Sequence, residues 1–200
     1  MADAARIAAS ELIVGGQKSG KSRRAEMLAA HWLAQSVAHR AVLIATARPG
    51  DVEMQQRIER HRQDRAARVP QLQTIEEPLA LAEAIAEHSK PHTLVIVDCL
   101  TLWLTNWLMP GPEFKKNQAL AQSGRAQAAI KSIATAEAFA ATPGPLVWVS
   151  NEIGLGVIPL GRVTREFVDA LGSLNQAVAQ RCERVTFMAA GLAVYIKGAP

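Results

Sequence analysis

Short apolar runs alternate with longer stretches of helical periodicity along this chain. The apolar runs are rich in β-branched residues, and helical patterns separate most of them. This alternation predicts an α/β fold, in which a mostly parallel sheet is flanked by helices and ligands bind at the carboxyl ends of the strands. The predicted strands lie at residues 12–14, 41–47, 93–100, 145–151 and 184–190, with a weaker one at 72–76.

The two ends of the chain differ in character. The last apolar run, residues 191–197, follows the preceding strand too closely for a crossover helix, so we expect an antiparallel hairpin strand. Residues 1–10 lack the apolar core of a secretory signal and are predicted to be a disordered leader. The remainder, residues 11–200, has the length of a single domain, with one irregular insertion at residues 109–118.

A glycine-rich stretch joins the first predicted strand to a predicted helix at residues 23–33. Its sequence, GGQKSGKS at residues 15–22, fits the phosphate-loop pattern G-x-x-x-x-G-K-[ST]. In such a loop the backbone N–H groups and the helix N-terminus bind phosphate oxygens. Lys21 would reach the outer phosphates, and the Ser22 hydroxyl would hold Mg²⁺, which prefers oxygen ligands. An ordinary glycine-rich turn is the alternative, but the strand–loop–helix context favours phosphate binding.

Asp98 directly follows the buried apolar run at residues 94–97. P-loop enzymes keep an acid at the end of such a strand to bind Mg²⁺, directly or through water. The alternative is a helix cap, because Asp98 precedes the helical stretch CLTLWLTNWL. We therefore predict that Asp98 and Ser22 together form the metal site.

The stretch DVEMQQRIERHRQDR, residues 51–65, is predicted to be an exposed helix. Spacing of four residues places Arg57, His61 and Arg65 along one stripe, with Asp64 one turn from the histidine. Neighbouring cations disfavour a protonated imidazole, and a neutral imidazole is a nucleophile. Taken alone, however, a charged helix with one histidine is usually a solvated surface.

Composition narrows the class of function. The net charge is +4, but the arginines are spread along the chain, which suits an anionic small molecule at least as well as nucleic acid. One tyrosine and four phenylalanines, with no basic run among them, argue against base stacking on nucleic acid. The two cysteines, Cys99 and Cys182, lack the spacing of a zinc site and suit a reduced cytoplasm. The most hydrophobic region, residues 94–109, is shorter than a membrane span and contains an aspartate.

Several motifs occur together in a specific order. They are GGQKSGKS, IATA, RIERHRQDR, TIEEP, IVDCLTLWLTN, VSNEIGLGVIP and ALGSLNQAVAQRCERV. In this order the chain, from about residue 11 to residue 197, resembles the bifunctional adenosylcobinamide kinase/adenosylcobinamide-phosphate guanylyltransferase family. The resemblance implies a P-loop NTPase (RecA-like) fold for one nucleotide-binding catalytic domain, and a homotrimer.

The resemblance also implies a two-step activity with Mg²⁺ as cofactor and ATP and GTP as substrates. The first step phosphorylates the aminopropanol hydroxyl of adenosylcobinamide. The second transfers GMP from GTP to adenosylcobinamide phosphate through a guanylylated histidine, which matches His61, with release of pyrophosphate. Lys21 is the other catalytic residue. By the same resemblance the nucleotide-binding residues are Gly15, Gly16, Gln17, Lys18, Ser19, Gly20, Lys21, Ser22, Thr46, Ala47, Arg48, Arg62, Gln63, Asp64, Arg65, Glu76 and Asp98.

Two other functions fit the same phosphate loop. One is a plain P-loop kinase of another small alcohol, in which His61 is an ordinary surface residue. The other is a RecA-like nucleic-acid-binding ATPase module, which the aromatic composition disfavours. The segment SNEIGLGVIP, residues 150–159, is open to three interpretations: a corrinoid contact, a subunit interface or a tight structural connection. Asn151 and Glu152 are therefore not assigned to catalysis at this stage.

Overall fold

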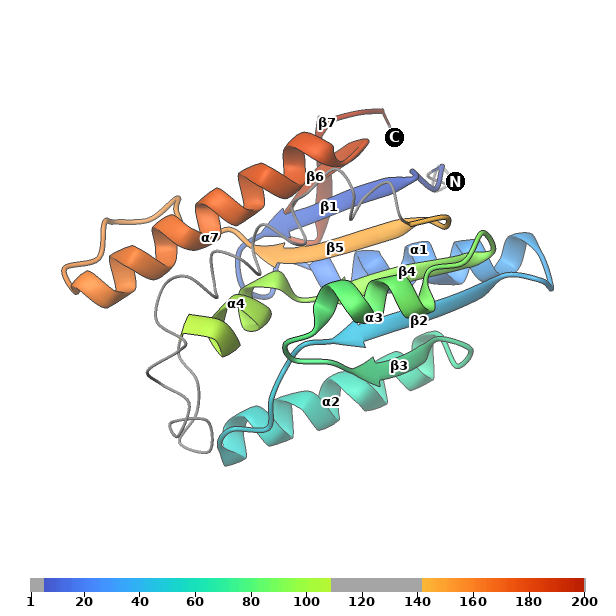
Figure 1. The fold of residues 1–200 in the computed structure, drawn as a ribbon, viewed down its shortest axis with the longest axis horizontal. Coiled ribbons are helices and arrows are strands. Elements are labelled where there is room, and N and C mark those ends of the chain that lie inside the picture. The colour runs from blue at the N-terminus through green and yellow to red at the C-terminus, as the bar shows by residue number, and fades with distance from the viewer. Residues whose placement is uncertain (1–5, 109–141, 200) are drawn as a thin grey trace.

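The structure is a computed structural model that describes residues 6–108 and 142–199. The insertion predicted at 109–118 lies outside the described residues. Within them the strands form one sheet in the order β3-β2-β4-β5-β1-β6-β7 (Figure 1). The strands are β1 (Ser10–Gly15), β2 (Arg40–Ala45), β3 (Gln73–Glu76), β4 (Thr93–Asp98), β5 (Leu146–Asn151), β6 (Arg184–Ala189) and β7 (Leu192–Lys197).

The pairing of these strands confirms the predicted α/β fold. Strands β1 to β6 run parallel to one another, and β7 runs antiparallel to its neighbour β6. Each predicted strand, including the weak one that became β3, is present within a few residues of its expected bounds. The hairpin strand is confirmed as well. A mostly parallel sheet that begins with a phosphate-loop motif is consistent with a P-loop NTPase-like fold.

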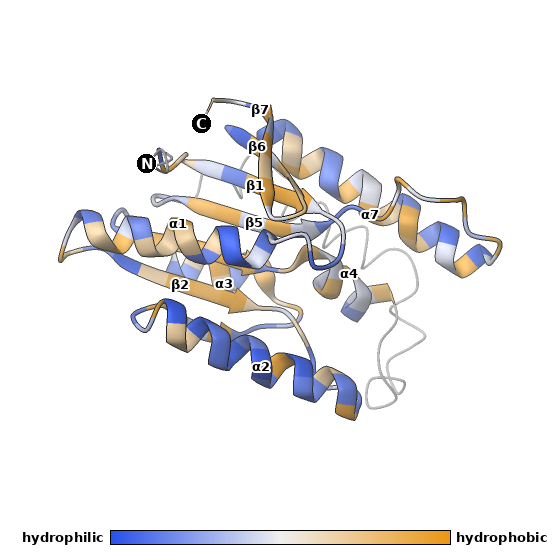
Figure 2. Ribbon diagram, turned by 180° about the vertical axis from the view of Figure 1, so that it is seen from behind, coloured by the Kyte–Doolittle hydropathy of each residue, from blue (hydrophilic) through white to orange (hydrophobic). Residues whose placement is uncertain are grey.

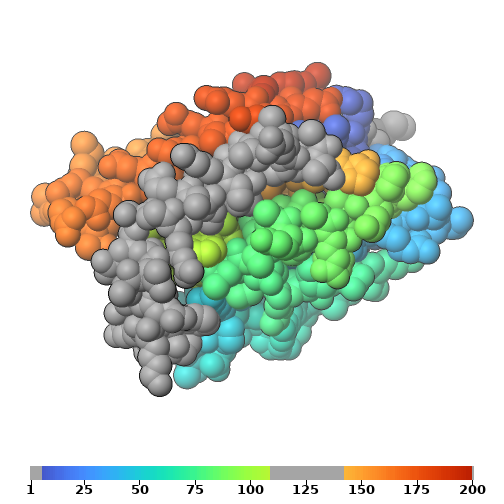
Figure 3. Space-filling model, in the orientation of Figure 1, coloured from blue at the N-terminus to red at the C-terminus, as the bar shows by residue number. Residues whose placement is uncertain are grey.

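Helices cover both faces of the sheet. Figures 1 and 3 show one face, with α3 (Leu81–His88), α4 (Leu100–Leu108) and α7 (Arg162–Arg181). Figure 2 shows the other face, with α1 (Lys21–Gln35) and α2 (Val52–Arg68), which extend the helices predicted at 23–33 and 51–65 by two or three residues at most ends.

Alternate residues of the central strands pack on opposite faces. Ile13 and Leu43 belong to the core beneath α1, whereas Leu12, Ile44 and Trp148 belong to the core beneath α3, α4 and α7. Because helices cover both faces of the sheet, both sets of alternating side chains on the central strands are buried. The central strands are therefore continuous apolar runs in the sequence. In α2, by contrast, only Arg65 is buried.

The N-terminal boundary differs from the prediction. Residues 6–10 of the expected leader are bound to the domain: Ala8 is buried, Arg6 forms an ion pair with Glu183, and Ala9 N donates a hydrogen bond of 2.7 Å to Glu183 Oε2. Ser10 already belongs to β1. The sequence could not reveal these contacts because the partner residue lies far along the chain.

No helix in the two described segments has the length and apolar character needed to cross a membrane.

Candidate active site

The carboxyl ends of β1, β5, β4 and β2 meet at one edge of the sheet. β5 lies between β1 and β4, with Asn151 opposite Gly15 on one side and Val149 opposite Asp98 on the other. The phosphate loop leaves β1 at this edge, and Asp98 ends β4 at the same edge. Two motifs that are more than 70 residues apart in the sequence therefore flank the end of a single strand.

Lys21 begins α1 and points back into its own loop. Its Nζ donates hydrogen bonds to Gly15 O at 3.0 Å and to Gly16 O at 2.7 Å, and the residue is only 8% exposed. Burial lowers the pKa of Lys21, while the nearby negative charge of Asp98 opposes that change. The ammonium group thus occupies the loop interior, where it can meet the outer phosphates of a nucleotide.

Two glycines of the loop are required by its geometry. Gly20 has a φ of 102°, and a Cβ on Gly15 would lie 2.4 Å from Met188 O in β6. A side chain at either position would displace the loop from the sheet edge or strain its backbone. Lys18, at the tip of the loop, also has a positive φ of 57°.

The hairpin of β6 and β7 supports this loop from the side. Gly191 N in the hairpin turn donates to Ser19 O at 3.0 Å. The hydroxyl of Ser19 is buried and has no hydrogen-bond partner among the described residues. It is therefore a donor left available inside a loop whose pattern is that of phosphate binding.

Asp98 and Ser22, the predicted metal ligands, lie near each other, close enough for the Ser22 hydroxyl to lower the pKa of the Asp98 carboxyl. Burial raises the pKa of Asp98, and the neighbouring cations Arg65 and Lys21 oppose that rise. The described residues contain no group of three or more His, Cys, Asp or Glu side chains suited to a metal. A carboxylate beside a hydroxyl is nevertheless the donor set that Mg²⁺ shares with nucleotide phosphates.

The helix α2 brings the predicted histidine stripe to this site. Asp51 caps the helix by accepting a hydrogen bond of 2.7 Å from Met54 N. His61 and Arg65 lie near enough to Asp98, and Arg57 near enough to Lys21, to influence the pKa values of those two residues. Arg65 is only 6% exposed, whereas His61 is exposed. The stripe thus lies near the phosphate loop and the end of β4.

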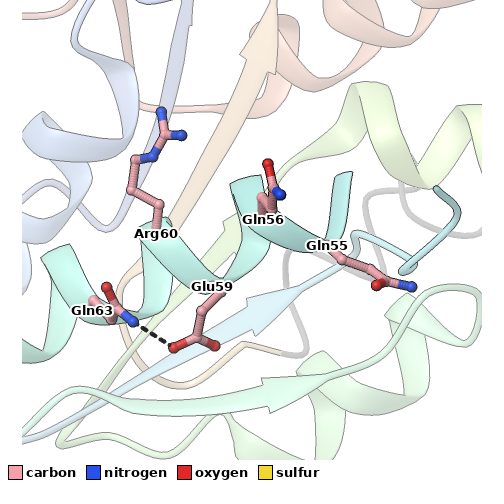
Figure 4. Close-up of a pocket in the computed structure, with 5 residues that line it drawn as sticks. All are labelled: Gln55, Gln56, Glu59, Arg60 and Gln63. Carbon is pink, nitrogen blue, oxygen red and sulfur yellow. Dashed lines mark hydrogen bonds between the residues drawn. The ribbon is translucent and has the colours of Figure 1, made fainter. Parts of the chain in front are cut away.

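The residues that follow His61 are divided between the two sides of α2. Arg62 forms an ion pair with Glu76 at the end of β3, so two predicted nucleotide contacts bind each other. Gln63 instead donates to Glu59 at 2.8 Å in a shallow hollow formed by α2 alone (Figure 4). Asp64 pairs with Arg68 at 3.2 Å.

Thr46, one of the predicted nucleotide contacts, is bound to the backbone at the end of β4. It is fully buried, its hydroxyl donates to Cys99 O at 2.7 Å and accepts from Cys99 N at 2.9 Å, and its N–H donates to Asp98 O. Thr46 therefore joins the ends of β2 and β4 and fixes the backbone on which Asp98 lies. Ala47 and Arg48, which are partly buried, continue from it toward α2.

Sequence reasoning missed two supports of this edge. Asn106 in α4 donates from Nδ2 to Thr46 O at 2.8 Å and to Pro78 O at 3.0 Å, which ties together the loops after β2 and β3. Glu152 N donates to Gly15 O at 3.0 Å, which ties the loop after β5 to the phosphate loop. Neither bond has a local sequence signal, because each depends on which strands are neighbours.

The fold and this site define a P-loop nucleotide-binding enzyme that acts on phosphate groups. A family model for cobinamide kinase / cobinamide phosphate guanyltransferase matches residues 11–196. The chain belongs to this family, whose description joins a kinase activity to a guanylyltransferase activity.

Similar proteins agree with this assignment. The chain is 46% identical over 191 residues to the bifunctional adenosylcobalamin biosynthesis protein CobP of Pseudomonas aeruginosa, covering 95% of this chain and 98% of that protein. It is 34% identical to the bifunctional adenosylcobalamin biosynthesis protein CobU of Escherichia coli, and 32% identical to that of Salmonella typhimurium, with 93% of this chain and 98% of each relative covered.

Proposed function

We propose that this enzyme phosphorylates adenosylcobinamide with ATP or GTP and then transfers GMP from GTP to the product, in the biosynthesis or salvage of cobalamin. The family assignment supports both activities. The observation that supports the finer proposal is the position of α2: Arg65 is buried, and His61 lies one helical turn before it, with both near Asp98. One site can therefore serve a phosphate-loop kinase and a histidine nucleophile.

In the kinase step the phosphate loop holds the triphosphate. The backbone N–H groups of residues 15–22 surround the phosphates, and Lys21 neutralises charge on the outer ones. Ser22 and Asp98 would hold Mg²⁺, which supplies charge neutralisation across the phosphates when it is bound. Among the remaining predicted contacts, Ala47 and Arg48 follow the end of β2, and Arg65 lies near Asp98. Arg62 and Glu76 would have to give up their mutual ion pair before either could contact a nucleotide.

In the guanylyl step His61 is the nucleophile. A neutral imidazole nitrogen attacks the α-phosphorus of GTP, so that a P–N bond forms and the bond to the bridging oxygen breaks, with the electron pair leaving on pyrophosphate. The phosphate of adenosylcobinamide phosphate then attacks the same phosphorus and releases the histidine. Arg57 and Arg65, on either side of His61 along the stripe, are placed to bind the phosphates during these transfers.

We further propose a cytoplasmic homotrimer. The cytoplasm is supported by Cys99 and Cys182, which are free and buried. Association is supported by the apolar residues of the segment after β5, whose ribbon is orange beside α7 in Figure 2. Leu155, Val157 and Leu160 are largely exposed there, and an apolar surface of this kind is typical of an interface.

Labelled GTP tests the guanylyl step directly. Incubation with GTP labelled at the α-phosphate should leave label on the denatured chain, whereas label at the γ-phosphate should be lost with pyrophosphate. Imidazole is a good leaving group from phosphorus when its ring is protonated, so the adduct should survive alkali and be lost in acid. This pattern distinguishes a histidine adduct from a serine ester.

Substitution locates the adduct. His61→Ala should abolish α-labelling while the melting temperature stays close to that of the wild type, because the side chain is exposed. His31→Ala, in α1, is the matched control and should label normally. If His61→Ala still acquires label, or if the adduct maps to another residue, the histidine assignment is wrong and the plain kinase becomes the better description.

A further inference from the structure

Glu152 is the first residue after β5, at the point between the phosphate loop and Asp98. Its N–H donates to Gly15 O at 3.0 Å, and the same oxygen accepts a bond of 3.0 Å from Lys21 Nζ. The backbone N–H of Glu152 and the ammonium group of Lys21, which would meet the outer phosphates, therefore share one acceptor, Gly15 O. A γ-phosphate held between Lys21 on one side and Asp98 on the other would lie over the end of β5.

The carboxylate of Glu152 is only partly used by the protein. Its Oε1 accepts a hydrogen bond of 2.6 Å from Gly154 N, which fixes the side chain. Within residues 6–108 and 142–199 no lysine, arginine or histidine forms an ion pair with it. The residue also lines a groove of about 790 Å³ between the segment 152–159 and α7. The groove is also lined by Val14, the residue before the phosphate loop, so a molecule bound in it would lie next to Glu152.

The other carboxylates at this edge have different partners. Asp98 lies beside Ser22 in the proposed metal site, and Glu76 on the outer strand β3 forms an ion pair with Arg62. Glu77 accepts bonds of 2.8 Å from Leu79 N and Ala80 N with one oxygen. Of these four, Glu152 alone lines the groove.

We propose that Glu152 is the general base of the kinase step and that the acceptor alcohol approaches through this groove. The proposal rests on the proposed function. As the alcohol oxygen forms its bond to the γ-phosphorus, the bond from that phosphorus to the β,γ-bridging oxygen breaks, and the nucleoside diphosphate leaves with the electron pair. The hydroxyl proton passes to the carboxylate oxygen that Gly154 does not occupy. The guanylyl step has no such requirement, because its acceptor is a phosphate monoester that is already largely ionised at pH 7.

The variant Glu152→Gln separates the two steps. Its amide oxygen can still accept the Gly154 N–H, so the loop should keep its shape, but the amide cannot take a proton. With adenosylcobinamide and γ-labelled ATP, we expect kcat to fall about 100-fold or more, within the range that general-base catalysis supplies. Transfer of GMP from GTP to separately supplied adenosylcobinamide phosphate should stay within about threefold of the wild type.

Controls keep the proposal open to refutation. Glu166→Gln, in an exposed ion pair of α7, should leave both steps unchanged. Glu152→Asp keeps a carboxylate and should recover at least about tenfold of the kinase rate lost in the glutamine variant. The proposal fails if Glu152→Gln retains the kinase rate, if both steps decline together, or if the aspartate variant is no better than glutamine. Absence of both steps in the wild type would instead refute the proposed function.

Discussion

Lys21, at the start of α1, and Asp98, at the end of β4, carry opposite charges at the same edge of the sheet. Burial lowers the pKa of Lys21 and raises the pKa of Asp98, so burial disfavours the charged form of each. The charge of each residue counteracts the effect of burial on the other. The cation and the anion of the phosphate site are therefore mutually supporting, and α2 adds the positive charge of Arg65 to the same balance.

Removal of the Asp98 charge tests its role as a metal ligand. Asp98→Asn should raise the Mg²⁺ concentration that gives half-maximal nucleotide binding roughly tenfold or more, because an amide is a poorer ligand than a carboxylate. Binding in EDTA should be unchanged or tighter, since a negative charge beside the triphosphate has been removed. Fluorescent nucleotide titrations at several Mg²⁺ concentrations measure both effects, with Glu87→Gln as control. An unchanged Mg²⁺ dependence would reduce Asp98 to a helix cap.

For individual residues of the site, the sequence was informative where a local pattern specifies the geometry. The spacing of the glycines with Lys21 and Ser22 predicts a loop that binds phosphate, and the apolar run before Asp98 predicts the sheet edge where it lies. The contacts of Thr46 could not be predicted in this way. Its hydroxyl could only be assigned once β2 and β4 were known to be neighbours, because its partner Cys99 lies 53 residues away.

Among the elements, α2 is attached to the molecule by charge. Figure 2 shows it largely hydrophilic, and Arg65 is its only buried residue. Arg62 pairs with Glu76 in β3, and Arg68 pairs with Glu26 in α1. The sequence predicted the helix and its histidine stripe from spacing. It could not predict these anchors, because a polar helix offers no apolar face to show which side meets the protein.

The contact between Arg68 and Glu26 should matter most for stability, because the Glu26 side chain is only 3% exposed. Arg68→Met leaves that carboxylate without its cation and should lower the free energy of unfolding by roughly 1–2 kcal/mol, a value reduced by the partial exposure of the arginine. Arg60→Met, on the exposed side of the same helix, should stay within about 0.5 kcal/mol of the wild type. Urea denaturation compares the two variants, and equal stabilities would show that the ion pair does not anchor α2.

Across the whole molecule, the strand positions were predictable but their order was not. Apolar runs bounded by turn residues locate each strand, and the short connection before β7 predicts its antiparallel direction. The insertion of β5 between β1 and β4 has no local signal, since it results from the packing of the crossover helices. That insertion places Glu152 beside the phosphate loop, and it explains why sequence reasoning left Glu152 without a role.

A buried network joins the first strand to the last part of the chain. Glu11 in β1 accepts hydrogen bonds from Thr186 Oγ1 in β6 at 2.7 Å, Arg184 Nη1 at 3.2 Å and Arg24 Nε in α1 at 3.0 Å. Tyr195 in β7 lies against both arginines, with its ring centroid 5.3 Å from Cζ of Arg24 and 5.6 Å from Cζ of Arg184. One carboxylate thus neutralises two cations between the phosphate-loop helix and the C-terminal hairpin.

Glu11→Gln tests whether this network holds the two parts together. The side chains of Glu11 and Arg184 are each 1% exposed, so loss of the carboxylate leaves a buried cation without its counter-ion. We expect a loss of about 3 kcal/mol in the free energy of unfolding, which lowers the Tm of a chain of this length by roughly 6–12 °C. Glu166→Gln, in a surface ion pair, should cost less than about 1 kcal/mol. Replacement of both buried partners, Glu11→Met with Arg184→Met, should recover part of the loss, because no charge then remains unpaired. If the double variant is less stable than Glu11→Gln, the network contributes through its hydrogen bonds and shape, and the unpaired charge is not the main cost.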